Sequence, residues 1–141
     1  MPPADAALAP ARSSLDAPWA LWTGRILSGL VVLALLASGA FKLSPKPDMV
    51  AMFTGKFGYP AGVLTGLGIV EIACAVLYAI PATAVLGAVL VTGYLGGAVA
   101  THLRVGDPVL IPLILGVLAW AGLWLRDGRL RALLPLNGRR G

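Results

Sequence analysis

The sequence predicts an all-α membrane protein, built as a bundle of four transmembrane helices with both termini in the cytoplasm. Three observations support this fold class. Hydrophobic residues make up 58% of the 141 residues, and charged residues only 12%, whereas about one quarter of the residues in soluble domains are charged. Four apolar runs also have the ~17 to 25 residues that a helix needs to cross a bilayer, and none alternates as a barrel strand does.

The four apolar runs cover residues 22–41, 60–80, 83–101 and 109–125. Together they predict a transmembrane domain at residues 19–125. The longest connection between spans is 42–59, so we expect no soluble catalytic domain between them. Any chemistry must then take place between the helices or at their ends. Glycine and proline inside such spans are tolerated where neighbouring helices satisfy the freed backbone groups.

The two flanks of this domain differ in composition. Residues 1–18 are rich in Pro, Ala and Ser without apolar periodicity, which predicts a disordered tail. Residues 126–141 predict a basic juxtamembrane tail, either a charged stop after the last span or a short amphipathic segment along the membrane surface. The first span ends in small residues that resemble a signal-peptide cleavage site, but the long region before it is not net positive, which favours a true span.

Lysine and arginine residues near the span ends predict the orientation in the membrane. Four spans place both termini on one side, which carries Arg12, Arg25, Arg126, Arg129, Arg131, Arg139 and Arg140, whereas the opposite loops carry Lys42, Lys46, Lys56 and Arg104. Cytoplasmic segments carry the excess of these residues, so seven against four favours cytoplasmic termini and a bacterial cytoplasmic (inner) membrane location. Without the distal Arg139 and Arg140 the comparison is five against four.

Residue counts exclude several classes of function. Cys74 is the only cysteine, so no intrachain disulfide or CxxC pair can form, which excludes thiol-disulfide relay chemistry. One histidine and one cysteine supply no metal-ligand cluster, and no phosphate loop or nucleophilic triad is present. The net charge of +5 does not predict a nucleic-acid partner, because the basic residues sit at membrane edges without interleaved exposed aromatics. The predicted partner is the lipid bilayer.

Glu71 is the strongest single indication of a site. It lies ~16 Å below the outer face of the second span at 1.5 Å per residue, near the middle of the bilayer. An acidic residue at that depth costs about 3 kcal/mol on insertion scales. The Glu71 side chain should therefore face the interior of the bundle and have a partner there.

Three residues are candidate partners for this carboxylate. Lys42 follows the first span and can extend its amine along apolar surface. His102 ends the third span. Tyr94, also on the third span, offers a phenol hydroxyl about one helical turn closer to the outer face than Glu71. With Glu71 they predict a polar funnel leading from the outer face into the bundle. The alternative is that Glu71 makes one structural interhelical hydrogen bond, while Lys42 and His102 only mark helix ends.

Arg104 is a further candidate residue of this site. If the third helix continued that far, its side chain would point about 200° away from that of His102 at 100° per residue. The two residues can therefore face one small site only if the helix ends between them. Asp107 and Pro108 predict the N-cap and first position of the fourth helix.

Glycines spaced four residues apart predict close helix packing. Gly93 and Gly97 form such a pair on the third span, and Gly58, Gly62 and Gly66 repeat the spacing on the second. We expect these glycines to pack helices within the bundle rather than to form a seam between two copies of the chain.

Several stretches of the chain resemble a known family. They are SGAFKL ending the first span, GYP opening the second, GIVEIACAVLYAIPATAVLGAVLVTGYLGGAVATHLRVGDP through the second and third, and GLWLRDGRLRALLP after the fourth. Over residues 24–135 they look like the DoxX-like family of small four-helix membrane proteins. The resemblance implies a four-helix integral membrane protein and places Lys42, Glu71, His102 and Arg104 on the polar motif positions of the family.

The resemblance implies less about activity. Named members have been linked to thiosulfate-quinone oxidation and to membrane-associated redox assemblies, and distant relatives act as assembly chaperones. The leading hypothesis is an accessory or assembly component of a membrane complex without autonomous catalytic activity. Its partner would be another membrane protein or a second copy, and a quinone is its candidate cofactor. The alternatives are a small proton-coupled carrier that uses Glu71, and an intramembrane oxidoreductase with bound quinone or haem.

Overall fold

The computed structural model describes residues 17–133, which are helical throughout their length apart from short connections. No strand occurs within this part of the chain. The elements are α1 (Pro18–Leu43), α2 (Pro47–Ala51), the π-helical turn η3 (Met52–Lys56), α3 (Val63–Ala79), α4 (Ala84–Arg104), α5 (Leu110–Arg126) and α6 (Gly128–Leu133). The all-α prediction is confirmed. Of the two predicted tails, residues 1–16 and 134–141 lie outside the described residues.

Each of the four predicted spans corresponds to one long helix. The helices α1, α3, α4 and α5 begin and end within four residues of the predicted bounds. By length and composition, α1 and α4 are long and apolar enough to cross a membrane. The other two, α3 and α5, are apolar helices of 17 residues each.

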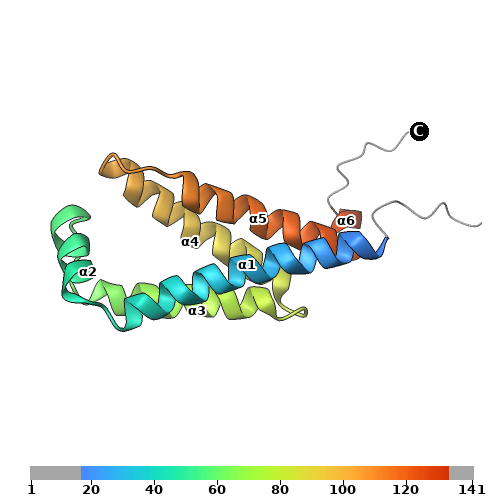
Figure 1. The fold of residues 1–141 in the computed structure, drawn as a ribbon, viewed down its shortest axis with the longest axis horizontal. Helices are drawn as coiled ribbons and strands as arrows, with labels where there is room; N and C mark the ends of the chain where they lie inside the picture. The colour runs from blue at the N-terminus through green and yellow to red at the C-terminus, as the bar shows by residue number, and fades with distance from the viewer. Residues whose placement is uncertain (1–16, 134–141) are drawn as a thin grey trace, which may run out of the picture.

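The four long helices form a ring in which each packs mainly against two others. α1 packs against α3 and α5, and α4 packs against the same two helices. Figure 1 shows α2 at one end of the molecule and α6 at the other, where both ends of the described chain also lie. We refer to these as the α2 end and the α6 end. Toward the α2 end, the α1 and α3 pair separates from the α4 and α5 pair (Figure 1).

The end of α4 lies three residues beyond the predicted span. Gly106 adopts the left-handed backbone conformation, with φ of 73°, and this conformation stops the helix after Arg104. The amide of Asp107 then donates to the carbonyl of His102 at 2.9 Å, which satisfies one of the carbonyls left open at the helix end.

The start of α5 differs from the prediction. The helix begins at Leu110, so the prediction that Asp107 and Pro108 cap it is wrong. The Asp107 carboxylate instead accepts a hydrogen bond from Nζ of Lys56 at 2.7 Å. This contact joins residues far apart in the sequence, so a local capping pattern could not reveal it.

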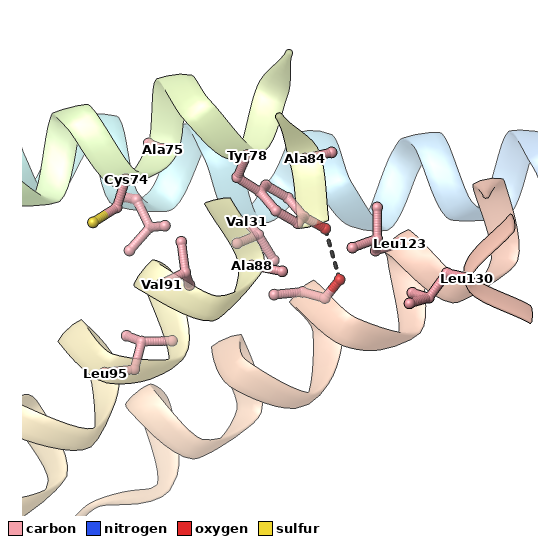
Figure 2. Packing of buried hydrophobic residues seen from close by; sticks show 12 residues of the cluster. Val31, Cys74, Ala75, Tyr78, Ala84, Ala88, Val91, Leu95, Leu123 and Leu130 are labelled. Carbon is pink, nitrogen blue, oxygen red and sulfur yellow. Dashed lines mark hydrogen bonds between the residues drawn. The ribbon is translucent and has the colours of Figure 1, made fainter. Parts of the chain in front are cut away.

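The apolar core lies between the four long helices and extends to α6 (Figure 2). α4 contributes Ala84, Ala88, Val91 and Leu95, whose spacing places them on one face of the helix. The other members are Val31, Leu35, Cys74, Ala75, Tyr78, Ala119, Leu123 and Leu130. Because Leu130 belongs to α6, part of the predicted basic tail packs against the bundle.

Tyr78 links three helices inside this core. The side chain is fully buried on α3, and its hydroxyl donates to the carbonyl of Ala119 on α5 at 2.7 Å, the bond drawn in Figure 2. Since a hydroxyl has one proton, the contact with Oγ of Ser28 on α1 at 2.9 Å has Ser28 as the donor. Arg126 donates to the backbone carbonyl of Tyr78 at 2.9 Å and stacks over its ring at 5.1 Å.

Removing the Tyr78 hydroxyl is expected to destabilise the protein. In Tyr78→Phe the Ser28 hydroxyl and the Ala119 carbonyl lose a buried partner, at a cost of about 1 to 3 kcal/mol. Thermal unfolding in detergent would show this as a lower midpoint. Tyr59→Phe is the matched control, because that hydroxyl bonds Thr101 at 2.8 Å in a partly exposed place. Equal midpoints for Tyr78→Phe and Tyr59→Phe would contradict the expected role of Tyr78.

Glycines allow the helices to approach closely at three crossings. Where α1 meets α5, a Cβ on Gly24 would lie 2.8 Å from the carbonyl oxygen of Gly122. Where α1 meets α3, a Cβ on Gly68 would lie 2.9 Å from the carbonyl oxygen of Gly39. Where α4 meets α3, a Cβ on Gly87 would lie 2.2 Å from the α3 backbone. No side chain larger than hydrogen fits at these positions without moving a helix.

The glycines predicted to pack the bundle are different ones. A Cβ on Gly62, Gly66, Gly93 or Gly97 would meet no atom of residues 17–133 within 4 Å other than its chain neighbours and the backbone of its own helix. The prediction of packing within the bundle is therefore wrong, because the spacing of small residues identifies a face but not whether a neighbouring helix lies against it. Gly58 precedes α3 altogether and forms a turn with φ of 68°.

Candidate functional site

A cavity of about 810 Å³ lies at the α2 end, where the two helix pairs separate. All four long helices and residues 47–59 contribute to its walls, which are mostly apolar. The apolar lining includes Phe41, Met52, Phe53, Leu67, Ile111 and Leu115. Its volume falls within the range of about 300 to 1,000 Å³ that is typical of sites for small molecules.

A buried ion pair lies in the lining of this cavity. Glu71, on α3, is only 3% exposed, and its Oε2 accepts a hydrogen bond from Nζ of Lys42 at 2.8 Å. Lys42 lies in the last turn of α1 and also donates to Oγ of Ser38, one turn earlier on the same face, at 2.6 Å. Of the three candidate partners for Glu71, Lys42 is the one that forms an ion pair with it.

The surroundings of this pair make it a polar site within an apolar wall. Two charges removed from water are stable together only when they lie close and their remaining hydrogen-bonding positions are satisfied. Ser38 satisfies a second proton of the Lys42 amine, and the Lys42 side chain keeps 14% of its surface exposed. The amine and the carboxylate therefore present a fixed donor and a fixed acceptor to whatever occupies the cavity.

α4 contributes two further polar side chains to the lining. Tyr94 lines the same cavity as Glu71. Nδ1 of His102 lies 2.7 Å from the carbonyl oxygen of Ala98, which can only accept, so Nδ1 is the donor. In a neutral ring Nε2 is then an acceptor. The structure thus brings Lys42, Glu71, Tyr94 and His102 to one cavity.

Arg104 is not part of this group. α4 continues through Arg104, so its side chain leaves the helix in a different direction from His102, as the helical angle requires. Its guanidinium donates to the backbone carbonyl of Phe57 and stacks over the ring of Tyr59 at 5.4 Å. Arg104 therefore holds the connection between η3 and α3 against the end of α4.

Residues 47–59, which we call the cap segment, form one wall of the cavity. Met49, Met52, Phe53 and Phe57 line it, and their spacing is that of one face of a helix. The sequence predicts this stretch only as a connection between spans and not as the wall of a cavity. The spacing of these four apolar residues was the signal that could have revealed it.

Polar contacts fasten the cap segment to the ends of α4 and α5. Lys56 forms an ion pair with Asp107 at 2.7 Å, in the connection between the two helices. The hydroxyls of Tyr59 and Thr101 lie 2.8 Å apart. Because the cap segment itself joins α1 to α3, these contacts connect the two helix pairs across the cavity.

The class of protein follows from the fold and the site together. Two apolar helices long enough to cross a bilayer indicate a membrane protein, and a mostly apolar cavity with a buried ion pair lies among its long helices. Residues 26–122 match the sequence profile of the DoxX-like family, and the chain belongs to that family. The predicted resemblance is confirmed, and the matched region includes every candidate residue of the polar site. No curated protein and no solved structure matches the chain.

Proposed function

We propose that the protein is an accessory or assembly component of a membrane complex, and that it binds a small lipidic molecule in the cavity at the α2 end. The observation that carries this proposal is the combination of mostly apolar walls with a buried ion pair, Lys42 with Glu71. An apolar chain suits the walls, and a polar end group suits the ion pair.

We further propose that all four long helices span the membrane, with the α6 end in the cytoplasm. Large apolar side chains are exposed on each of them, for example Leu33, Ile69, Val89 and Val117, each more than half exposed. Such a surface is expected where a protein faces lipid. The 17 residues of α3 and of α5 are at the lower limit of ~17 to 25 for a span. The orientation rests on the lysine and arginine count of the sequence.

The polar groups of the cavity define what kind of end group would bind. Lys42 and Tyr94 can donate hydrogen bonds to a head group, so a head group with acceptor oxygens fits these two residues. Glu71 and Nε2 of a neutral His102 ring are acceptors, which suit a hydroxyl on the same head group. A quinone, the candidate cofactor, has carbonyl oxygens that accept hydrogen bonds, and its apolar tail suits the walls. Bound there, it would supply two-electron redox chemistry, while the residues of this chain would hold its carbonyls and exclude water.

Purification in native nanodiscs, with mass spectrometry of every co-eluting molecule, tests the proposal. The wild type is expected to retain a lipidic molecule or a membrane protein partner. Ala98→Trp, which fills the cavity, and Glu71→Gln, which removes the charged acceptor, should each lose most of the lipidic molecule. Ala100→Trp is the matched control, because Ala100 is exposed on the same helix and lies outside the cavity.

The outcomes separate the parts of the proposal. A lipidic molecule lost from Ala98→Trp but kept by Glu71→Gln would support the cavity and contradict a role for the carboxylate in binding. A wild-type protein that carries neither a ligand nor a partner would contradict the proposed function. Proton-coupled uptake by proteoliposomes would then be the function to measure.

A further inference from the structure

The α6 end has a second, smaller pocket, which shares no lining residue with the cavity at the α2 end. Its volume is about 210 Å³, below the range of about 300 to 1,000 Å³ for sites that bury whole small molecules. A pocket of this size suits a small polar group. Three arginines, Arg25, Arg126 and Arg129, line it together with a single acidic residue, Asp127.

The single acid of this pocket is already engaged. Oδ1 of Asp127 accepts a hydrogen bond from the backbone amide of Arg129 at 2.9 Å, at the start of α6, and lies 3.5 Å from Nε of the same residue. It therefore offsets the charge of Arg129. The positive charges of Arg25 and Arg126 have no acidic partner among residues 17–133.

Arg126 has hydrogen-bonding capacity that the described residues leave unused. A guanidinium has five N–H donors. One of its terminal nitrogens donates to the carbonyl of Tyr78 at 2.9 Å, whereas Nε is buried and has no acceptor among residues 17–133. Nε itself is closed to the pocket, but the terminal nitrogens of Arg126 carry N–H groups beyond the one given to Tyr78, and these are the donors available to an anion.

Two features of the neighbourhood add to the attraction for an anion. The pocket reaches Ala84, the first residue of α4, and this helix start has neither a side-chain cap nor an acidic residue in its first turn. The free amides of such a helix end favour negative charge. Trp19 and Trp22 are more than half exposed nearby on α1, and Arg25 stacks over Trp22 at 5.4 Å. Exposed tryptophans are typical of the head-group level of a bilayer.

We infer that this pocket binds a phosphate group, and that Arg25, Arg126 and the start of α4 hold it. The group is carried by the head group of an anionic phospholipid or by a soluble phosphate ester. Guanidinium groups bind phosphate oxygens through paired, charge-assisted hydrogen bonds, which matches the donors available here.

Thermal unfolding of the full chain in detergent tests this inference. Short-chain phosphatidylglycerol, short-chain phosphatidylcholine and glycerol 3-phosphate are added in separate titrations. The variant Arg25→Gln removes an arginine of the pocket that is exposed to solvent and has no acidic partner among residues 17–133, and it leaves Arg126, which contacts Tyr78, in place. The matched control is Lys46→Gln, which removes the same charge from an exposed residue at the α2 end.

Phosphatidylglycerol is expected to raise the unfolding midpoint of the wild type more than phosphatidylcholine does. Arg25→Gln should bind it about ten to a hundred times more weakly, and Lys46→Gln should bind it as the wild type does. Saturable stabilisation by glycerol 3-phosphate, lost in Arg25→Gln, would support the pocket and identify a soluble ester as the source. Equal weakening in Arg25→Gln and Lys46→Gln, or no stabilisation by any of the three additives, would overturn the inference.

Discussion

Replacing Gly87 with alanine is expected to prevent the bundle from assembling as observed. The added Cβ would lie 2.2 Å from the backbone nitrogen of Tyr78 and 2.4 Å from its Cα. Backbone atoms cannot rotate away as a side chain can, so α4 would have to move away from α3. Overpacking in a core typically costs about 1 to 3 kcal/mol, and we expect the upper part of that range or more.

Size-exclusion elution in detergent and the thermal unfolding midpoint would measure this effect. Gly66→Ala is the matched control, because Gly66 lies inside α3 and an added Cβ would meet nothing within 4 Å. Alanine is favoured over glycine in a helix by about 0.5 to 1 kcal/mol, so the control should be unchanged or more stable. A Gly87→Ala protein that elutes and unfolds like the wild type would show that α4 does not approach α3 this closely.

Separating the two members of the buried ion pair is expected to have the next largest effect. Lys42→Met leaves the Glu71 carboxylate buried without a cation, and breaking a buried pair in this way costs about 3 to 5 kcal/mol. Glu71→Met should cost less, because the Lys42 amine lies near the end of α1 and can extend toward the bilayer surface. The double variant Lys42→Met/Glu71→Met should recover most of the lost stability.

A double-mutant cycle on unfolding midpoints measures the coupling between the two residues. The exposed pair Lys56 with Asp107 is the control, since disrupting a surface pair with Lys56→Gln should change the free energy of unfolding by no more than about 1 kcal/mol. If the double variant were as unstable as the sum of the two single variants, the pair would not act as a unit. A double variant that is stable but lacks the lipidic molecule would separate the role of the pair in binding from its role in folding.

The long helices and the burial of Glu71 could be predicted from the sequence for physical reasons. The length of an apolar run is a local property, and the energetic penalty of an acid in hydrocarbon applies whatever the neighbouring helices are. That Lys42 would be its ion-pair partner could not be predicted. It depends on which helices are neighbours and at what depth Lys42 and His102 lie, and both follow from the packing of the whole bundle.

The roles of the glycines and of Tyr78 also could not be predicted from the sequence. Gly66 and Gly93 have the spacing of packing glycines, yet the close approaches occur at Gly39, Gly68 and Gly87. In the sequence Tyr78 is an ordinary member of an apolar span, but its hydroxyl connects α3 to Ser28 on α1 and to Ala119 on α5. In each case the sequence contains the residue, but its role depends on a partner that lies elsewhere in the chain.

The separation of the helix pairs toward the α2 end divides the molecule into a rigid half and an adaptable half. The crossings at Gly24, Gly122 and Gly87 and the Tyr78 contacts fix the helices near the α6 end, where few substitutions can be accommodated. Near the α2 end one close crossing, Gly39 with Gly68, holds α1 to α3, and α4 has none. The walls around the 810 Å³ cavity make no such crossings at Gly93 or Gly97, and larger side chains fit there. Selectivity for a new ligand can therefore evolve, or be engineered, at the α2 end while the assembly of the helices stays intact.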